Sequence, residues 1–171
     1  MLSKIDIRDI VRDHLATLVD YRTQKASRPD YVLFFFVPAV AAATLMYLKV
    51  RLTDAAVNVL ITALSIFAGL LFNLLVLIAS LVDKRSAPTG ASDARQVMRS
   101  IYANIAYSLL VSLLTLLPLG VFATLKDGLT KNSAMALSYY LIGHFALTLL
   151  MVLKRMHVLL SFEFREGKPG P

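Results

Sequence analysis

The sequence predicts an all-α, polytopic membrane protein with four transmembrane helices plus an N-terminal cytosolic amphipathic helix. Three observations predict this fold class. First, 57% of the 171 residues are hydrophobic, whereas about 45–50% is usual for a soluble domain. Second, the apolar residues form four long runs without any charge. Third, lysine and arginine gather in the segments that would share one side of the membrane. Because backbone groups in lipid must pair within their own segment, such runs are expected to be helices.

The four charge-free runs have the length that a membrane helix requires, since about 20 apolar residues cross about 30 Å of hydrocarbon. The runs cover residues 31–48, 55–82, 100–125 and 132–153. They place the spans at about 31–49, 56–81, 100–125 and 134–155, with a cytosolic loop at 83–99. The chain is then organised as an amphipathic helix and linker at 1–29, a four-helix transmembrane domain at 30–158 and a cytosolic tail at 159–171.

The positive charges set the expected topology. Fourteen of the 18 lysine and arginine residues lie before the first span, in the loop at 83–99 or after the last span. The positive-inside rule places such segments in the cytosol. Both termini are therefore expected to be cytosolic, and only short turns are expected on the outer side.

The segment 3–25 is expected to form the N-terminal helix. Ile7, Val11, His14 and Leu18 recur at helical spacing and give it one apolar stripe. The opposite face carries Arg8, Asp9, Arg12, Asp13 and Asp20. This mixture of charges favours contact with protein over contact with a lipid surface, where polar faces are usually rich in lysine and arginine.

Several signals locate the turns and ends of the other helices. Pro38 falls inside the first span and is expected to loosen one turn. The alanines that follow it allow another helix to approach closely. The third helix is expected to begin at Ser92 or Asp93, before the membrane. The fourth is expected to continue past Arg155, through Phe164.

Polar residues inside the spans recur on single helix faces. The second span carries Asn58, Thr62, Ser65, Gly69 and Asn73, the third carries Asn104, Ser108, Ser112 and Thr115, and the fourth carries Ser138, His144 and Thr148. Such faces contact protein or water rather than lipid. The candidates for intramembrane polar contacts or gating are His144, Asn73, Asn58, Asn104, Ser65, Ser108 and Thr115. Two long polar faces also predict a homo-oligomer, with a tetramer favoured. Whether they line a wet pore or a dry seam stays open.

His144 is an imidazole close to the expected middle of the membrane. We interpret it as a neutral side chain that forms hydrogen bonds across helices, with Ser65, Thr115 or Thr44 as candidate partners. Gating or sensing is the alternative, because an ionisable group at this depth is a functional candidate. Proton transport is disfavoured, because a relay needs several titratable groups in series.

Neither catalysis nor metal binding is expected. The chain has no cysteine and three histidines, and His14, His144 and His157 fall at very different depths, whereas a metal site needs three or four ligands together. Residues 8–14, RDIVRDH, match the loose pattern of HEPN ribonucleases, but one short amphipathic helix cannot form such a domain. We expect a protein that is not an enzyme, has no cofactor and does not bind nucleic acid directly.

The layout as a whole resembles a known group. A short four-span chain with cytosolic termini, an N-terminal amphipathic helix and no catalytic signature is similar to the membrane subunits of bacterial anti-phage defence systems, among them KwaA, the membrane component of the Kiwa system. The resemblance implies an oligomer in the bacterial inner membrane that senses infection at the envelope and works with a cytosolic DNA-binding partner. No residue roles are carried over, because no motif matches.

Two classes of function follow as expectations. The first is a sensor or scaffold that contacts membrane lipid and recruits a soluble cytosolic protein. Its candidate partner-binding residues are Arg8, Arg12, Arg95, Arg99, Phe162 and Phe164. The second is a pore-forming effector, or a small channel or transporter.

Overall fold

The structure is a computed structural model that describes residues 7–18, 28–84, 92–125 and 128–166. Every element within these ranges is helical. The elements are α1 (Arg8–Ala16), α2 (Arg28–Tyr31), the π-helix η2 (Val32–Phe36), α3 (Val37–Tyr47), α4 (Asp54–Lys84), α5 (Ser92–Thr124) and α6 (Leu129–Glu166). The expected start of the third helix at Ser92 and the continuation of the fourth past Arg155 are both confirmed.

Three helices are long and apolar enough to cross a membrane. These segments are Asp54–Ser80 in α4, Met98–Thr124 in α5 and Leu129–His157 in α6. Because such helices bury their backbone polar groups in their own hydrogen bonds, they indicate a membrane protein. The apolar helix Val32–Tyr47 is shorter than the other three. The first predicted span, at 31–49, therefore stays a prediction.

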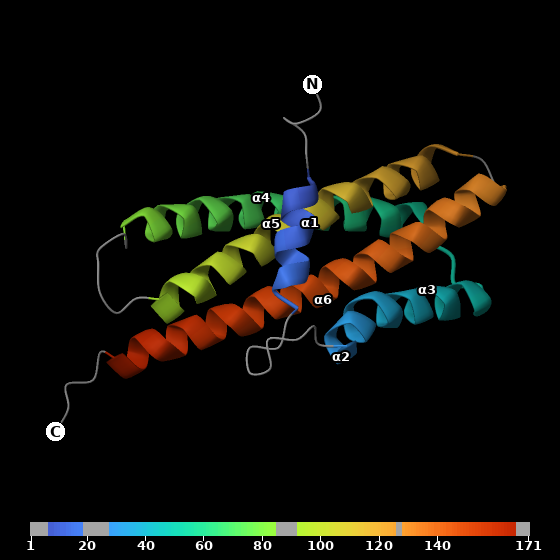
Figure 1. Cartoon of the computed structure of the whole chain (residues 1–171). Helices are drawn as coiled ribbons and strands as arrows, with labels where there is room; N and C mark the ends of the chain where they lie inside the picture. Colours follow the sequence, from blue (N-terminus) through green and yellow to red (C-terminus); the bar gives the residue numbers. More distant parts are fainter. Residues whose placement is uncertain (1–6, 19–27, 85–91, 126–127, 167–171) are drawn as a thin grey trace.

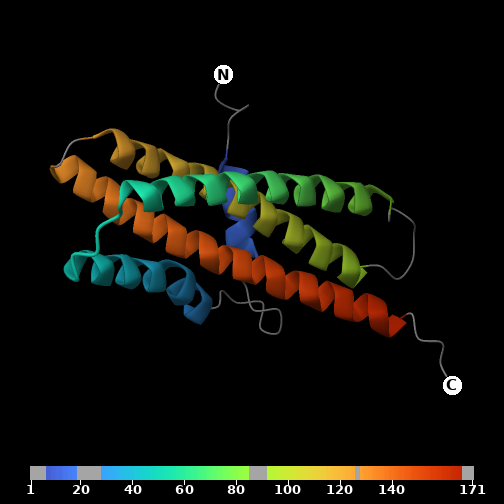
Figure 2. The same ribbon diagram turned by 180° about the vertical axis from the view of Figure 1, so that it is seen from behind.

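The three long helices and the shorter α3 form a row in the order α4, α5, α6, α3. Helix α5 packs against both α4 and α6, and α3 packs against α6. Figures 1 and 2 show the same order from opposite sides, with α3 and α4 at the two edges. Half of the apolar segment of α5 is buried, compared with 17% of that of α4. Helix α5 is therefore the central helix, and α4 is left largely uncovered.

The core runs along α5 and its neighbours. Ile101, Ile105 and Leu119 of α5 are completely buried. Val57 and Ile78, near the two ends of α4, belong to the same hydrophobic cluster. Apolar side chains at helical spacing on facing surfaces therefore hold α4 and α5 together along most of their length.

Helix α1 crosses the row at a steep angle and packs against α5 (Figure 1). His14 and Leu18 are buried at this contact, whereas Arg8 and Arg12 are exposed. The helix ends at Ala16, so it covers only part of the predicted helix at 3–25. Residues 1–6 and 19–27 lie outside the described part of the chain, and the cytosolic position of this segment stays a prediction.

The turn of the chain before Pro38 is loosened, as the sequence predicts. Residues Val32–Phe36 form a π-helix, in which the N–H of Val37 donates to the carbonyl of Val32. Proline has no N–H and its ring crowds the preceding turn, which is a known cause of such irregularities. Gly143 of α6 faces this site, where a Cβ atom would lie 3.4 Å from the Cβ of Pro38. The glycine therefore allows α6 to approach the loosened turn closely.

Helix α3 ends in a Schellman motif. The N–H of Val50 donates to the carbonyl of Leu45 over 3.0 Å, and the N–H of Lys49 donates to that of Met46 over 3.1 Å. Lys49 occupies the left-handed position of this motif, with φ of 54°, where glycine is usual. Tyr139 of α6 then fastens the turn, because its hydroxyl donates to the carbonyl of Val50 over 2.9 Å.

Candidate functional site

His144 of α6 is 2% exposed and has a hydrogen-bond partner at each ring nitrogen. Its Nδ1 lies 2.8 Å from the carbonyl oxygen of Phe34, and its Nε2 lies 2.8 Å from the hydroxyl of Tyr107. A carbonyl can only accept, so Nδ1 carries the proton and donates it to Phe34. Nε2 then accepts from the tyrosine hydroxyl. We assign the neutral imidazole on this basis.

The carbonyl of Phe34 needs such a donor because of Pro38. In an α-helix the carbonyl of residue i accepts from the N–H of residue i+4, and Pro38 occupies that position. Proline has no N–H to offer, and an unpaired carbonyl within an apolar region is costly. His144 of α6 therefore supplies the hydrogen-bond donor that the helix around Phe34 lacks at this turn.

The expected partners of His144 were wrong. Ser65, Thr115 and Thr44 each donate to the carbonyl four residues earlier in their own helix, at 2.6–2.8 Å. Hydroxyl side chains in apolar helices commonly bond to their own backbone in this way. Both nitrogens of His144 are bonded to Phe34 and Tyr107 instead.

Tyr107 connects His144 to helix α1. The rings of Tyr107 and His14 stack at a centroid distance of 3.8 Å and an angle of 5°. The same tyrosine donates its hydroxyl to His144. Tyr107 is 8% exposed, so both of its contacts are held within the packed centre of the row.

Asn104 of α5 holds the other side of His14. Its Oδ1 accepts from Nδ1 of His14 at 2.8 Å. The hydroxyl of Thr17 lies 2.9 Å from the same oxygen, but its single proton is shared with the nearer carbonyl of His14 at 2.6 Å. Nδ2 of Asn104 donates to the carbonyl of Ser100 at 2.8 Å, which fixes the orientation of the amide. His14 must therefore carry its proton on Nδ1.

The Nε2 atom of His14 is left without a partner. The side chain is fully buried, and Nε2 has no hydrogen bond within the described part of the chain. Burial, with the nearby His144 and Arg155 adding to it, lowers the pKa of His14 from 6.5 to about 4. The packing of α1 against α5, which we call docking, therefore requires that the imidazole of His14 be neutral at ordinary pH.

Arg155 of α6 holds the C-terminal end of α1. Its guanidinium donates to the carbonyl of Thr17 over 2.6 Å, and Thr17 is the C-cap residue of α1. A cation at the C-terminal end of a helix is favoured by the helix dipole. Together with His14, this contact fastens α1 to two different helices.

These contacts form one continuous path between four elements. The path leads from α1 through His14 to Tyr107 of α5, from there to His144 of α6, and from His144 to Phe34 of η2. Phe34 also makes an edge contact with His14, at a centroid distance of 6.2 Å. Packed or hydrogen-bonded contacts therefore connect α1 to the loosened turn before α3.

The other predicted polar residues divide between buried and exposed. Asn104, Ser108 and Thr115 are buried, and Ser108 donates to the carbonyl of Asn104 in its own helix. Asn58, Ser65 and Asn73 of α4 are exposed on the single chain. The polar face of the second predicted span is thus turned away from the rest of the chain.

The predicted partner-binding residues are only partly described. Arg8, Arg12 and Arg99 are exposed. The side chains of Arg95, Phe162 and Phe164 lie outside the described part of the structure, although their backbones belong to α5 and α6. The structure therefore places three of the six on the surface.

Sequence reasoning missed Tyr107, Thr17 and the role of His14. A tyrosine within an apolar run is usually an ordinary core residue. Tyr107 does not share the helical spacing of the polar residues in the third span, so its hydroxyl was not recognised as a partner. His14 on the apolar stripe of an amphipathic segment was a usable signal, because a buried imidazole needs a polar partner. Pro38 also pointed to a free carbonyl four residues earlier.

Comparison with known proteins adds no family. The chain matches no protein-family model, no curated protein and no solved structure.

Proposed function

We propose that this chain is a non-enzymatic subunit of the bacterial inner membrane that forms a homo-oligomer, acts as a sensor or scaffold and recruits a soluble cytosolic partner in anti-phage defence. The single observation that carries the proposal is the path from α1 to Phe34 described above. It connects a helix with exposed charges to a loosened turn in the apolar part of the chain. The defence role rests on the resemblance of the layout alone.

The proposal includes a fourth span. Helices α2, η2 and α3 are continuous from Arg28 to Tyr47. Twenty residues at 1.5 Å each are about 30 Å long, which equals the thickness of the hydrocarbon. The burial of Phe34, Pro38 and Ala42 against the row supports a helix that packs beside α6 over the middle of that length.

The proposal also places α1 on the cytosolic side of His144. Arg155 lies 11 residues after His144, a distance of about 16 Å along α6. A guanidinium near the end of a span is usually at the interface. Because Arg155 reaches the C-cap of α1 and His14 stacks on Tyr107, this helix crosses the row between the levels of His144 and Arg155. Its exposed Arg8 and Arg12 then face the cytosol.

The mechanism is a change in the docking of α1. When a partner or an envelope disturbance moves α1, Tyr107 loses the stacked ring of His14, and Asn104 loses the donor Nδ1 of His14. Tyr107 is then free to move away from His144, and the bond to Phe34 weakens in turn. A contiguous network with two arrangements is the physical requirement for such coupling.

Partner recruitment is tested by co-purification from cells that carry the chain in its native membrane. Charge reversal at Arg8 and Arg12 is expected to abolish capture of a soluble protein. Reversal of Arg51, which is exposed and expected on the outer side, serves as the control and is expected to leave capture unchanged. Equal capture by all variants excludes the face of α1 as the recruitment surface.

Coupling through the path is tested separately. Asn104→Leu removes the acceptor of His14, and Ser108→Ala is the control, because Ser108 is buried on the same helix but bonds only to its own backbone. We expect Asn104→Leu to abolish protection against phage in a plating assay, and Ser108→Ala to retain it. Loss of protection in both variants, or in neither, contradicts a signalling role of the path.

A pore is the second candidate function, because the polar face of α4 is exposed on the single chain. In an oligomer such a face could surround water. Ion flux across liposomes that contain the purified chain tests this candidate. Flux that falls on Asn73→Leu supports a pore, and liposomes without flux support the sensor or scaffold.

A further inference from the structure

Helix α4 has its polar side chains on the side that faces away from the core. Val57, Leu64 and Leu71 are at most 4% exposed and pack inward. Asn58, Thr62, Ser65, Gly69 and Asn73 are all exposed. At 100° per residue these two sets lie on roughly opposite sides of the helix. We call the second set the α4 stripe.

The α4 stripe is not satisfied by its own chain. The hydroxyls of Thr62 and Ser65 donate to the carbonyls of Asn58 and Ile61, each over 2.8 Å. The side-chain amides of Asn58 and Asn73 have no hydrogen-bond partner within the described part of the chain. Contact of a bare amide with lipid is costly. Another polar surface at the same depth removes that cost.

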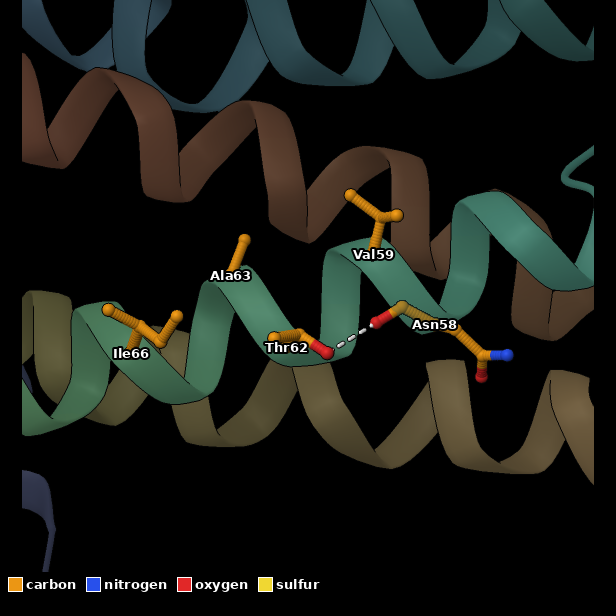
Figure 3. Close-up of a pocket in the computed structure, with 5 residues that line it drawn as sticks. All are labelled: Asn58, Val59, Thr62, Ala63 and Ile66. Carbon is orange, nitrogen blue, oxygen red and sulfur yellow. Dashed lines mark hydrogen bonds between the residues drawn. The ribbon is translucent and has the colours of Figure 1, made fainter.

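The stripe also has the shape of a close helix contact. A Cβ atom added at Gly69 would meet nothing within 4 Å, so the single chain has no packing reason for glycine there. Ser65 and Gly69 are four residues apart, which is the small-residue spacing of membrane helix pairs. A shallow hollow of about 360 Å³ lies on the adjoining side of α4, and it is lined by Asn58, Val59, Thr62, Ala63 and Ile66. This hollow is centred outside the stripe and is not counted as part of the contact. Figure 3 shows these five side chains along one side of α4.

We propose that the α4 stripe is the contact between two parallel copies of this chain, and that this contact is a dry seam. The proposal rests on the homo-oligomer of the proposed function and identifies its interface. Parallel copies place every residue at the depth of its counterpart, so Asn58 meets Asn58 and Asn73 meets Asn73. A side-chain amide both donates and accepts. The asparagines are therefore complementary to themselves, as a symmetric interface requires.

One further feature favours a second copy over a different protein, and another makes the stripe accessible. The run at 55–82 carries no charge, so α4 offers a foreign helix no ionic contact to recognise. Helix α4 also lies at one edge of the row, and α3 lies at the other (Figures 1 and 2). The stripe is thus accessible to a neighbour without any rearrangement of the chain.

Cysteine cross-linking in native membranes tests the seam. The chain has no cysteine, so single variants report one position each. Ser65→Cys and Gly69→Cys are expected to form an oxidised band of twice the mass of the chain. Leu70→Cys is the matched control, because Leu70 is 59% exposed, adjacent to Gly69 in depth and turned about 100° away from it. We expect it to remain unlinked.

The outcomes of this experiment separate the alternatives. Equal cross-linking at Ser65, Gly69 and Leu70 indicates random collision and overturns the proposal. So does a linked band that contains a different protein, and so does the absence of any link. Rapid reaction of the cysteine at position 69 with a membrane-impermeant thiol reagent indicates a water-filled lining, and this also overturns the dry seam.

Energy transfer between labelled copies in liposomes measures the strength of the contact. Gly69→Ile is expected to weaken association at least about tenfold, because it blocks close approach. Asn73→Leu is expected to weaken it about threefold or more, through the lost interhelical hydrogen bond. Leu70→Ile is expected to change it less than about twofold. Unchanged association in Gly69→Ile contradicts the proposal.

The failure of this interface and the failure of the proposed function have different signatures. If Gly69→Ile dissociates the copies, capture of a soluble partner through Arg8 and Arg12 still tests the sensor or scaffold role. If the copies remain associated in Gly69→Ile and the soluble partner is still captured, only the location of the seam is wrong.

Discussion

The imidazole of His144 takes the place of the backbone N–H that Pro38 cannot give to the carbonyl of Phe34. The two groups are 2.8 Å apart and come from residues separated by 110 positions in the chain. An imidazole in an apolar region is therefore explained by the proline on a neighbouring helix. The histidine remains neutral there, and each of its nitrogens is paired.

The pairing of His144 with the proline turn makes a prediction about stability. His144→Leu leaves the Phe34 carbonyl and the Tyr107 hydroxyl unpaired, and is expected to destabilise the chain by about 1–3 kcal/mol. In a Pro38→Ala background, the new alanine has a backbone N–H that can donate to Phe34, so the same histidine change is expected to cost less. Unfolding of the purified chain by SDS in mixed micelles measures both costs. Equal costs in the two backgrounds contradict the compensation.

The hydroxyl of Tyr107 is expected to matter separately from its ring. Tyr107→Phe keeps the ring stacked on His14 but removes the donor to His144. We expect a loss of about 1 kcal/mol in the free energy of unfolding. Tyr102→Phe is the control, because Tyr102 lies on the same helix and is 41% exposed. An equal effect of the two changes would show that the bond to His144 contributes nothing.

Docking of α1 is expected to weaken in acid. The pKa of His14 falls from 6.5 to about 4 on burial, so the undocked helix binds more protons than the docked one between these values. The stability of docking is complete above pH 6.5 and decreases as the pH falls, by about 1.4 kcal/mol per unit, until about pH 4. Hydrogen exchange of the amides in Arg8–Ala16 measures this loss.

The control for this pH dependence is His14→Phe. Phenylalanine keeps a ring against Tyr107 but cannot be protonated. The protection of the α1 amides, which is their exchange rate relative to the intrinsic rate at each pH, is therefore expected to vary little between pH 6.5 and 4. Tyr107, His144 and Arg155 face the same position and are unchanged in the variant. A pH dependence identical to that of the original chain assigns the effect to another titratable group and contradicts the role of His14.

Replacement of Lys49 by glycine is predicted to stabilise the folded chain. Its φ of 54° places a side chain in the left-handed region, where glycine avoids a steric cost of about 1 kcal/mol. Lys49→Gly is expected to raise the free energy of unfolding by about 0.5–1 kcal/mol. Lys49→Ala keeps the Cβ atom and is expected to give no gain. A gain in the alanine variant would attribute the effect to the lost charge.

The helices could be predicted because their signal is local. The charge-free runs give α4, α5 and α6, and Ser92 gives the start of α5, because length, apolar content and capping are properties of short segments. The loosened turn before Pro38 followed from the missing N–H. None of these inferences required knowledge of which helices are neighbours.

The site could not be predicted because its contacts join distant segments. The partner of His144 is a backbone carbonyl, which has no signature in the sequence. The polar faces of α4 and α5 look alike as patterns, yet the face with Asn104 is buried beneath α1 and the face with Asn73 is exposed. Only the order of the helices in the row distinguishes them.

The position of α3 at the edge of the row affects how the chain can be assembled during its synthesis. Helix α3 leaves the ribosome before α4, α5 and α6, but among these three it packs only against α6, which leaves last. Until then the Phe34 carbonyl has no imidazole donor and Pro38 has no Gly143 beside it. Helix α3 is thus the first apolar helix to be synthesised and the last to pack in its final position. A chain that stops before His144 lacks the residue that pairs with the Phe34 carbonyl.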